Sequence, residues 1–158
     1  MNSRLLLPIV LTLLSLVNAA AADKSVLVRA CIYAVPKKAA LALMDAPAFT
    51  SDPQASIHAL RGMVAEKKAS VASNLCVSAL LGTRTNIQSD FMLQFEVTEA
   101  EGGAIKLVAA LEKRMKAPTP QILATLTLKR GDTQFLGSCD DPSSDPNAPT
   151  WIVFVTLQ

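Results

Sequence analysis

Histidine, glycine and aromatic side chains are scarce in this chain of 158 residues. His58 is the one histidine, so a second imidazole to share a metal ion is lacking. The six glycines form no phosphate-binding loop, and the G-x-S-x-G pattern of a serine hydrolase is absent. Neither sign of charge dominates: Lys and Arg number 15 and Asp and Glu 13. We therefore expect no catalytic residue, no cofactor and no nucleic-acid partner, which would need a clear basic surface.

The first 22 residues have the three-part pattern of a secretory signal peptide. Arg4 precedes an apolar run from Leu5 to Val17, and small residues follow from Ala19 to Ala22. This run of about 13 residues is shorter than the roughly 20 that a membrane-spanning helix needs. We predict that residues 1–22 are removed, and that residues 23–158 form one exported domain in the periplasm or outside the cell.

Three cysteines, Cys31, Cys76 and Cys139, belong to the predicted mature chain. An exported protein meets an oxidising compartment, where disulfides can form, and no C-x-x-C redox motif is present. Cys31 and Cys76 each fall on the more polar face of a predicted strand, so they could pair if the strands are neighbours. That bond would close a loop of roughly 45 residues and contribute about 4 kcal/mol in the chain-entropy model. Three unpaired thiols are the alternative.

Most of the chain alternates apolar and polar residues with the period of β-strands. The clearest case is Phe91, Leu93, Phe95 and Val97, which alternate with more polar residues. Strands are predicted at residues 26–35, 70–81, 90–98, 105–111, 122–129, 133–137 and 150–157. The last of these is apolar on both faces, which is typical of a central strand covered on two sides.

Helices are predicted only near the N-terminus, at residues 37–46 and 53–67. Asp52 followed by Pro53 favours a helix start, because the carboxylate accepts bonds from free backbone N–H groups and proline fits the first turn. Ile57, Leu60 and Val64 then lie on one helical face. The sequence therefore predicts an α+β fold: a mostly antiparallel β-sheet of about six or seven strands, with one or two helices near the N-terminus.

An acidic loop at residues 138–149 is the strongest candidate for metal chemistry. Asp140, Asp141 and Asp145 supply oxygen ligands of the kind that calcium prefers. The loop lacks the regular ligand alternation and the final glutamate of a helix-loop-helix calcium site. We therefore interpret it as a solvated turn that follows a hairpin, in which residues 125–128 and 133–137 flank the turn at Arg130, Gly131 and Asp132.

Several of these segments resemble the C-terminal core of the bacterial secretins, the ring-forming outer-membrane proteins of type II and type III secretion and pilus systems. The segments are VLVRACIYAVP at 26–36, ALRGMVAEKKASVASNLCVSALLGTRTNIQS at 59–89, LQFEVT at 93–98, GGAIKLVAAL at 102–111, ILATLTLKRGDTQFLG at 122–137 and WIVFVT at 151–156. The large N-terminal ring domains and the long membrane hairpins of typical secretins have no counterpart here. The resemblance therefore implies a small secretin-like domain that acts by contacts and not by conduction.

These observations predict an exported, non-enzymatic domain that binds other proteins through exposed strand edges. The expected partners are further copies of the chain or components of a secretion or pilus system, with outer-membrane association implied by the resemblance. One alternative is an unrelated periplasmic ligand-binding or inhibitor domain. Another is a hydrolase that uses Asp140 or Asp141 with a metal ion.

Overall fold

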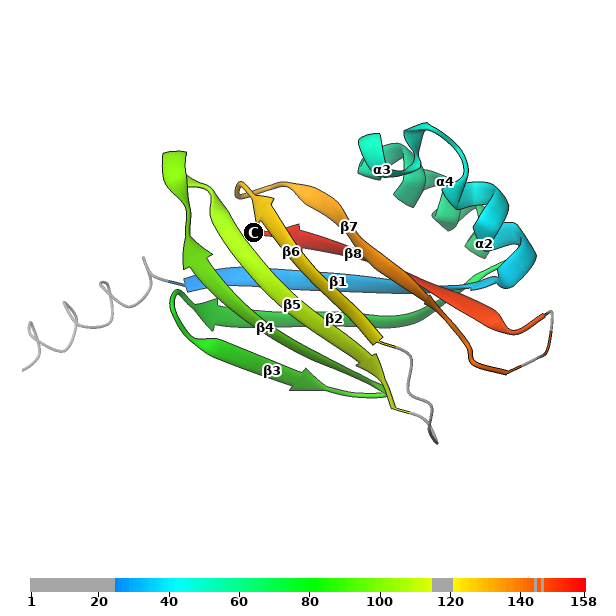
Figure 1. The fold of residues 1–158 in the computed structure, drawn as a ribbon. Helices are drawn as coiled ribbons and strands as arrows, with labels where there is room; N and C mark the ends of the chain where they lie inside the picture. The colour runs from blue at the N-terminus through cyan, green and yellow to red at the C-terminus, as the bar shows by residue number, and fades with distance from the viewer. Residues whose placement is uncertain (1–24, 115–120, 144, 146) are drawn as a thin grey trace, which may run out of the picture.

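The computed structural model describes residues 25–114, 121–143, 145 and 147–158 (Figure 1). The predicted signal peptide and its cleavage site lie outside the described residues. The elements are β1 (Ser25–Pro36), α2 (Lys37–Met44), α3 (Ala48–Ser51), α4 (Pro53–Ala65), β2 (Ser70–Leu80), β3 (Arg84–Gln88), β4 (Phe91–Glu99), the single turn η1 (Glu101–Gly103), β5 (Ile105–Lys113), β6 (Gln121–Leu128), β7 (Thr133–Asp140) and β8 (Pro149–Leu157).

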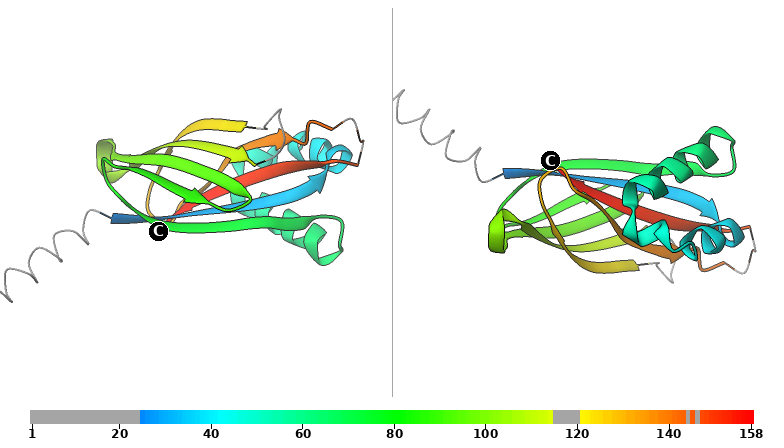
Figure 2. Two further views of the ribbon diagram at one scale, coloured as in Figure 1. Left: turned by 90° about the horizontal axis from the view of Figure 1, so that it is seen from below. Right: turned by 90° about the horizontal axis from the view of Figure 1, so that it is seen from above.

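The strands form two four-stranded antiparallel sheets that pack face to face. One sheet has the order β2-β1-β8-β7 and the other has the order β3-β4-β5-β6. The three helices lie against the outer face of the first sheet, toward one end, so we call it the helix-covered sheet and the other the open sheet (Figures 1 and 2). The predicted class, a mostly antiparallel α+β fold, is confirmed.

The core between the sheets includes the side chains of β4 that strand alternation predicted to point inward. Phe91, Leu93, Phe95 and Val97 of β4 are all buried, each at most 2% exposed. They belong to the same buried cluster as Val28 of β1. Because neighbouring residues of a strand point to opposite faces, this alternation determines which face of the open sheet is buried.

β8 is buried on both faces, as predicted. Trp151, Val153 and Val155 belong to the core between the sheets. Ile152 and Phe154 belong to a second cluster, beneath the helices. The open sheet covers one face of β8 and the helices cover the other, so apolar side chains are required on both faces.

The helices are held by an aromatic cluster and by a side-chain cap. Phe49 of α3 makes edge contacts with Phe135 and Phe154, at ring-centroid distances of 5.2 and 5.9 Å. The Asp52 carboxylate accepts a hydrogen bond from the Ala55 N–H at 3.0 Å, which confirms the predicted start of α4. Leu60 is the fully buried member of the predicted apolar stripe of α4.

The numbers of strands and helices differ from the prediction. The described residues contain eight strands, not six or seven, because β3 was not expected. The segment of β3, Arg84–Gln88, has alternating exposed and half-buried positions and only one large apolar residue, Ile87. The described residues also contain three helices, not one or two. The additional helix, α3, forms in the segment before Asp52, where the side chain of Phe49 is buried.

The predicted hairpin at residues 125–137 is instead a crossing between the two sheets. β6 is the last strand of the open sheet and β7 is the last strand of the helix-covered sheet, and no ladder joins the two. The turn is closed by Asp132, whose side chain accepts a hydrogen bond from Lys129 N–H at 2.8 Å, and by Gly131 at φ +90°. The sequence marks a turn here, and the same turn residues serve a crossing as well as a hairpin.

Candidate binding edge

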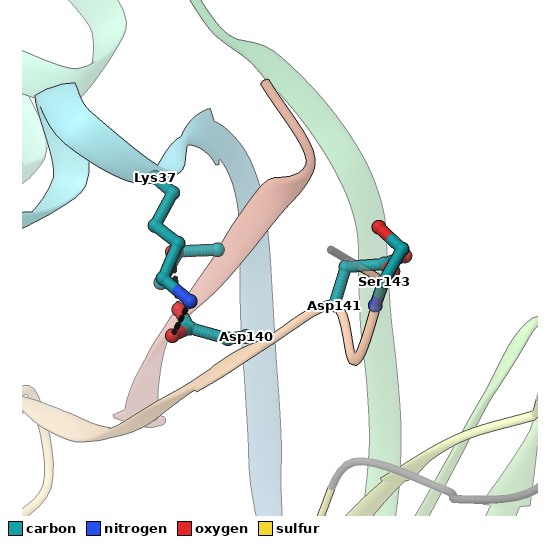
Figure 3. A network of polar contacts seen from close by, with 5 residues as sticks. Lys37, Asp140, Asp141 and Ser143 are labelled. Atoms are coloured by element: carbon teal, nitrogen blue, oxygen red, sulfur yellow. Dashed lines mark hydrogen bonds and ion pairs between the residues drawn. The ribbon is translucent and has the colours of Figure 1, made fainter. Parts of the chain in front are cut away.

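The acidic-loop carboxylates, considered from the sequence as candidate metal ligands, are engaged in local structural contacts. Asp140, at the end of β7, pairs with Lys37 Nζ at 2.9 Å and accepts a hydrogen bond from the Thr150 hydroxyl (Figure 3). Asp141 accepts a bond from the Ser143 N–H at 2.9 Å (Figure 3), and Asp145 accepts one from the Asn147 N–H. Among the described residues, no group of three or more His, Cys, Asp or Glu side chains could hold a metal ion.

Asp140 links the start of α2 to the closing strand. The hydrogen bond from Thr150, followed by that from Lys37, lowers the pKa of the Asp140 carboxyl below its ordinary value. Thr150 is buried, whereas the two charged side chains are each a little under half exposed. The contact therefore stabilises the junction of α2, β7 and β8 and is only partly screened by solvent.

We expect this contact to make stability depend on pH. Because the folded pKa lies below the unfolded value, the contribution of Asp140 is complete above the unfolded value, near pH 4. It is lost as the pH falls through the folded pKa. The stability difference between the wild type and Asp140→Asn should therefore be largest at pH 7 and should shrink below about pH 4. Urea unfolding at pH 7 and pH 3 measures it, with Asp141→Asn as the control. An equal difference at both pH values would contradict the contact.

Cys31 and Cys76 lie on neighbouring strands and on the same face, but they are not opposite each other. Cys31 faces Asn74, and Cys76 faces Arg29. Such a diagonal offset separates side chains by about 7 to 8 Å, whereas a disulfide needs Cβ atoms about 4 Å apart. Both are free thiols in this structure, and a bond between them would require β2 to slide by two residues along β1.

The three thiols differ in their surroundings. Cys139 is half-buried opposite Trp151, and burial followed by the charge of Asp140 raises its pKa to about 11. It is therefore a poor nucleophile at neutral pH. Cys31 is half-buried beside the helix-side cluster, whereas Cys76 is exposed in the middle of β2. His58, the other residue singled out in the sequence, is exposed on α4.

The outer edge of β2 pairs with no further strand in the part of the chain that the structure describes. Figure 2 shows β2 at the rim of the helix-covered sheet in both views, with β1 on its inner side. Hydrogen bonds join Leu27 N–H to the Gln158 carbonyl at 3.0 Å and Gln158 N–H to the Leu27 carbonyl at 2.8 Å. Leu27 therefore points its backbone groups toward β8. Because successive residues of a strand alternate, Val28 and Ala30 point theirs toward β2.

The same alternation identifies the outward groups of β2. Val77 and Leu75, the partners of Val28 and Ala30, point their backbone groups inward to β1. Asn74, Cys76 and Ser78 consequently point theirs outward. In the part of the chain that the structure describes, no hydrogen bond reaches the backbone of these three residues. The register is regular from 73 to 80, since the one irregularity lies opposite Ile32 and Tyr33.

The other edge strands are less accessible or carry charge. On β6, the Thr127 carbonyl accepts a hydrogen bond from the Gln134 side chain of β7 at 3.3 Å. β7 has a bulge between Phe135 and Gly137. β3 is only five residues long and begins with Arg84. β2, in contrast, has eleven residues with no charge and no proline, which are the usual means of blocking an edge.

A second exposed feature is the outer face of the open sheet. Leu123 and Val108 are 77% and 47% exposed there. They flank a shallow hollow of about 410 Å³ whose lining also includes Arg84, Gln94 and Glu96. The hollow lies on an open surface and is lined by both apolar and charged groups.

Comparisons with known proteins identify no family. No family model matches the sequence, and no curated protein matches it. A solved structure, ExeD of Aeromonas hydrophila, superposes with a TM-score of 0.48 and 12% identity. The match covers 96% of this chain and 52% of that chain, so this chain spans about half the length of the structure it matches. Within the described residues, no helix is long and apolar enough to cross a membrane.

Proposed function

We propose that this chain is an exported, non-enzymatic binding domain whose β2 edge accepts a strand from another protein chain. The open backbone groups of Asn74, Cys76 and Ser78 are the observation that carries this proposal. An added strand would bond to these groups and extend the helix-covered sheet from four strands to five. The affinity would come from main-chain bonds, and the selectivity from the side chains on either face of β2.

The resemblance of the strands to the secretin core supports a role beside a secretion or pilus machinery, in the periplasm or at the outer membrane. The signal-like N-terminus supports the same compartment. In this role the domain would hold a partner and catalyse no reaction. The engaged carboxylates of the acidic loop favour binding over the metal-dependent hydrolase considered from the sequence.

Photo-crosslinking in the native host tests the proposal whatever the identity of the partner. A photoreactive phenylalanine analogue at Ser78 should form crosslinks to another polypeptide, whether a second copy or a different protein. The same group at Lys106, exposed on the outer face of the open sheet, is the control and should form few.

A proline substitution in β2 tests whether the crosslinks depend on pairing at this edge. Asn74→Pro removes one outward N–H and no backbone bond to β1, and the side-chain bond from Arg29 that it also loses is exposed, so the sheet should tolerate it. The Ser78 crosslinks should then disappear, while the melting temperature changes little. Crosslinks that persist in the proline variant, or that are equally abundant at Lys106, would show that β2 is not the docking strand.

A further inference from the structure

We propose that the strand which β2 accepts is the β2 of a second copy of this chain, in an antiparallel pair about a two-fold axis at Cys76. This inference rests on the proposed function, because it names the partner of the same edge. The two helix-covered sheets would join into one sheet of the order β7-β8-β1-β2-β2-β1-β8-β7. Two copies related by a two-fold axis present the same surface to each other, so the edge must be complementary to itself.

The pairing register follows from the backbone alternation. In an antiparallel pair, the residues that exchange two hydrogen bonds must both point outward from their own sheets. On β2 the outward residues are Asn74, Cys76 and Ser78. A two-fold axis at Cys76 places the two Cys76 residues opposite each other and places Asn74 opposite Ser78 of the second copy. An axis at Asn74 or Leu75 would extend the pairing into the irregular segment before residue 73. An axis at Val77 would pair Asn74 with Leu80, whose carbonyl already accepts a hydrogen bond from Thr83 N–H, and an axis at Ser78 would extend the pairing past the end of the strand.

The charges of β2 permit this self-pairing. Residues 70–80 include no Asp, Glu, Lys or Arg, so no like charges meet at the axis. The charge nearest to the axis belongs to Arg29 of β1, which lies opposite Cys76. The Arg29 side chain donates a hydrogen bond to the Asn74 side chain at 3.3 Å. Arg29 and its counterpart in the second copy would be three strand spacings apart, about 15 Å, which exceeds the screening length in physiological salt.

The side chains of β2 are also self-complementary. Asn74, Cys76 and Ser78 are small and leave room above the new pair. Val71 and Leu80, each 49% exposed, lie near opposite ends of the strand. Antiparallel pairing brings the end that carries Val71 beside the end that carries Leu80 of the second copy. Both apolar side chains would lose contact with water there, and this arrangement favours a second copy over an unrelated strand.

Sedimentation equilibrium of the purified mature chain, in reductant, tests the dimer. The wild type and Cys76→Ser should both dimerise, because the pairing is through the backbone and needs no disulfide. Cys76→Lys should raise the dissociation constant by roughly tenfold or more, since it puts two like charges opposite each other. Thr125→Lys, on the exposed face of β6, is the matched control and should dimerise like the wild type.

A thiol crosslink checks the register. In a Cys31→Ser, Cys139→Ser background, a short bismaleimide should join two chains through Cys76, whereas the same background with Cys76→Ser should give none. A wild type that remains monomeric at every concentration, or a Cys76→Lys variant that dimerises normally, would overturn the inference. If the purified chain stays monomeric while Ser78 crosslinks a different protein in cells, the proposed function stands and only the second copy is excluded.

Discussion

Leu128→Ala should lower the free energy of unfolding by roughly 2 to 5 kcal/mol, the range for a leucine removed from a packed core. Leu128 ends β6 and is fully buried in the core between the sheets, in the same cluster as Val155 and Leu157 of β8. Alanine there would leave a cavity beside the crossing from β6 to β7. Urea unfolding of the purified chain measures the change.

Leu123→Ala is the matched control, because Leu123 lies on the same strand but is 77% exposed. It should change the free energy of unfolding by no more than about 0.5 kcal/mol. If the two variants lost similar stability, β6 would not have the two faces described above.

Gly137→Ala should also be strongly destabilising, for a different reason. Gly137 lies in the bulge of β7 at φ +153°, and a Cβ atom there would be 2.6 Å from Cγ2 of Ile122. Ile122 is β-branched and buried on β6, so its side chain cannot easily move aside. Overpacking of this kind costs roughly 1 to 3 kcal/mol, and the unfavourable backbone angle adds about 1 kcal/mol or more.

A double-mutant cycle separates the two causes. Ile122→Ala removes Cγ2, so the double variant should be less destabilised than the sum of the single variants by about 0.5 kcal/mol or more. Gly62→Ala is a control for which the opposite effect is expected. Gly62 lies in α4 with no atom close to the new Cβ, so this substitution should stabilise the protein by about 0.5 to 1 kcal/mol. Strict additivity at 122 and 137 would mean that these two strands do not touch there.

Local patterns predicted the elements whose burial is one-sided or complete. The inward face of β4 and the two apolar faces of β8 follow directly from alternation, because each buried position must carry an apolar side chain. The start of α4 follows from Asp52 and Pro53, whose effects reach only a few residues.

Features that depend on distant partners were missed. β3 has little apolar pattern, since it is a short edge strand held by its ladder to β4. The turn at Gly131 was expected to close a hairpin, because nothing in residues 129–132 specifies that β6 pairs with β5 and that β7 pairs with β8. Likewise, the sequence placed Cys31 and Cys76 on suitable faces but could not give the register between their strands.

The sequence predicted the kind of candidate site, an exposed strand edge, but not which strand forms it. Exposed strand edges were expected from a mostly antiparallel chain, whereas the acidic loop was the only named chemical cluster. That β2 is the open edge follows from the sheet order and from the hydrogen bonds of Leu27 with Gln158. The sheet order and these hydrogen bonds join residues that are far apart in the sequence, so local sequence patterns cannot predict them. The absence of charge in residues 70–80 was the signal that could have indicated it.

Amide hydrogen exchange along β2, followed by NMR on a dilute sample of the mature chain, tests the open edge most directly. Alternation should appear: the amides of Asn74, Cys76 and Ser78 should exchange rapidly, and those of Leu75 and Val77 should be protected by their bonds to β1. Equal protection of all five amides in the dilute chain would mean that another part of the chain covers β2, and would contradict the proposed binding edge.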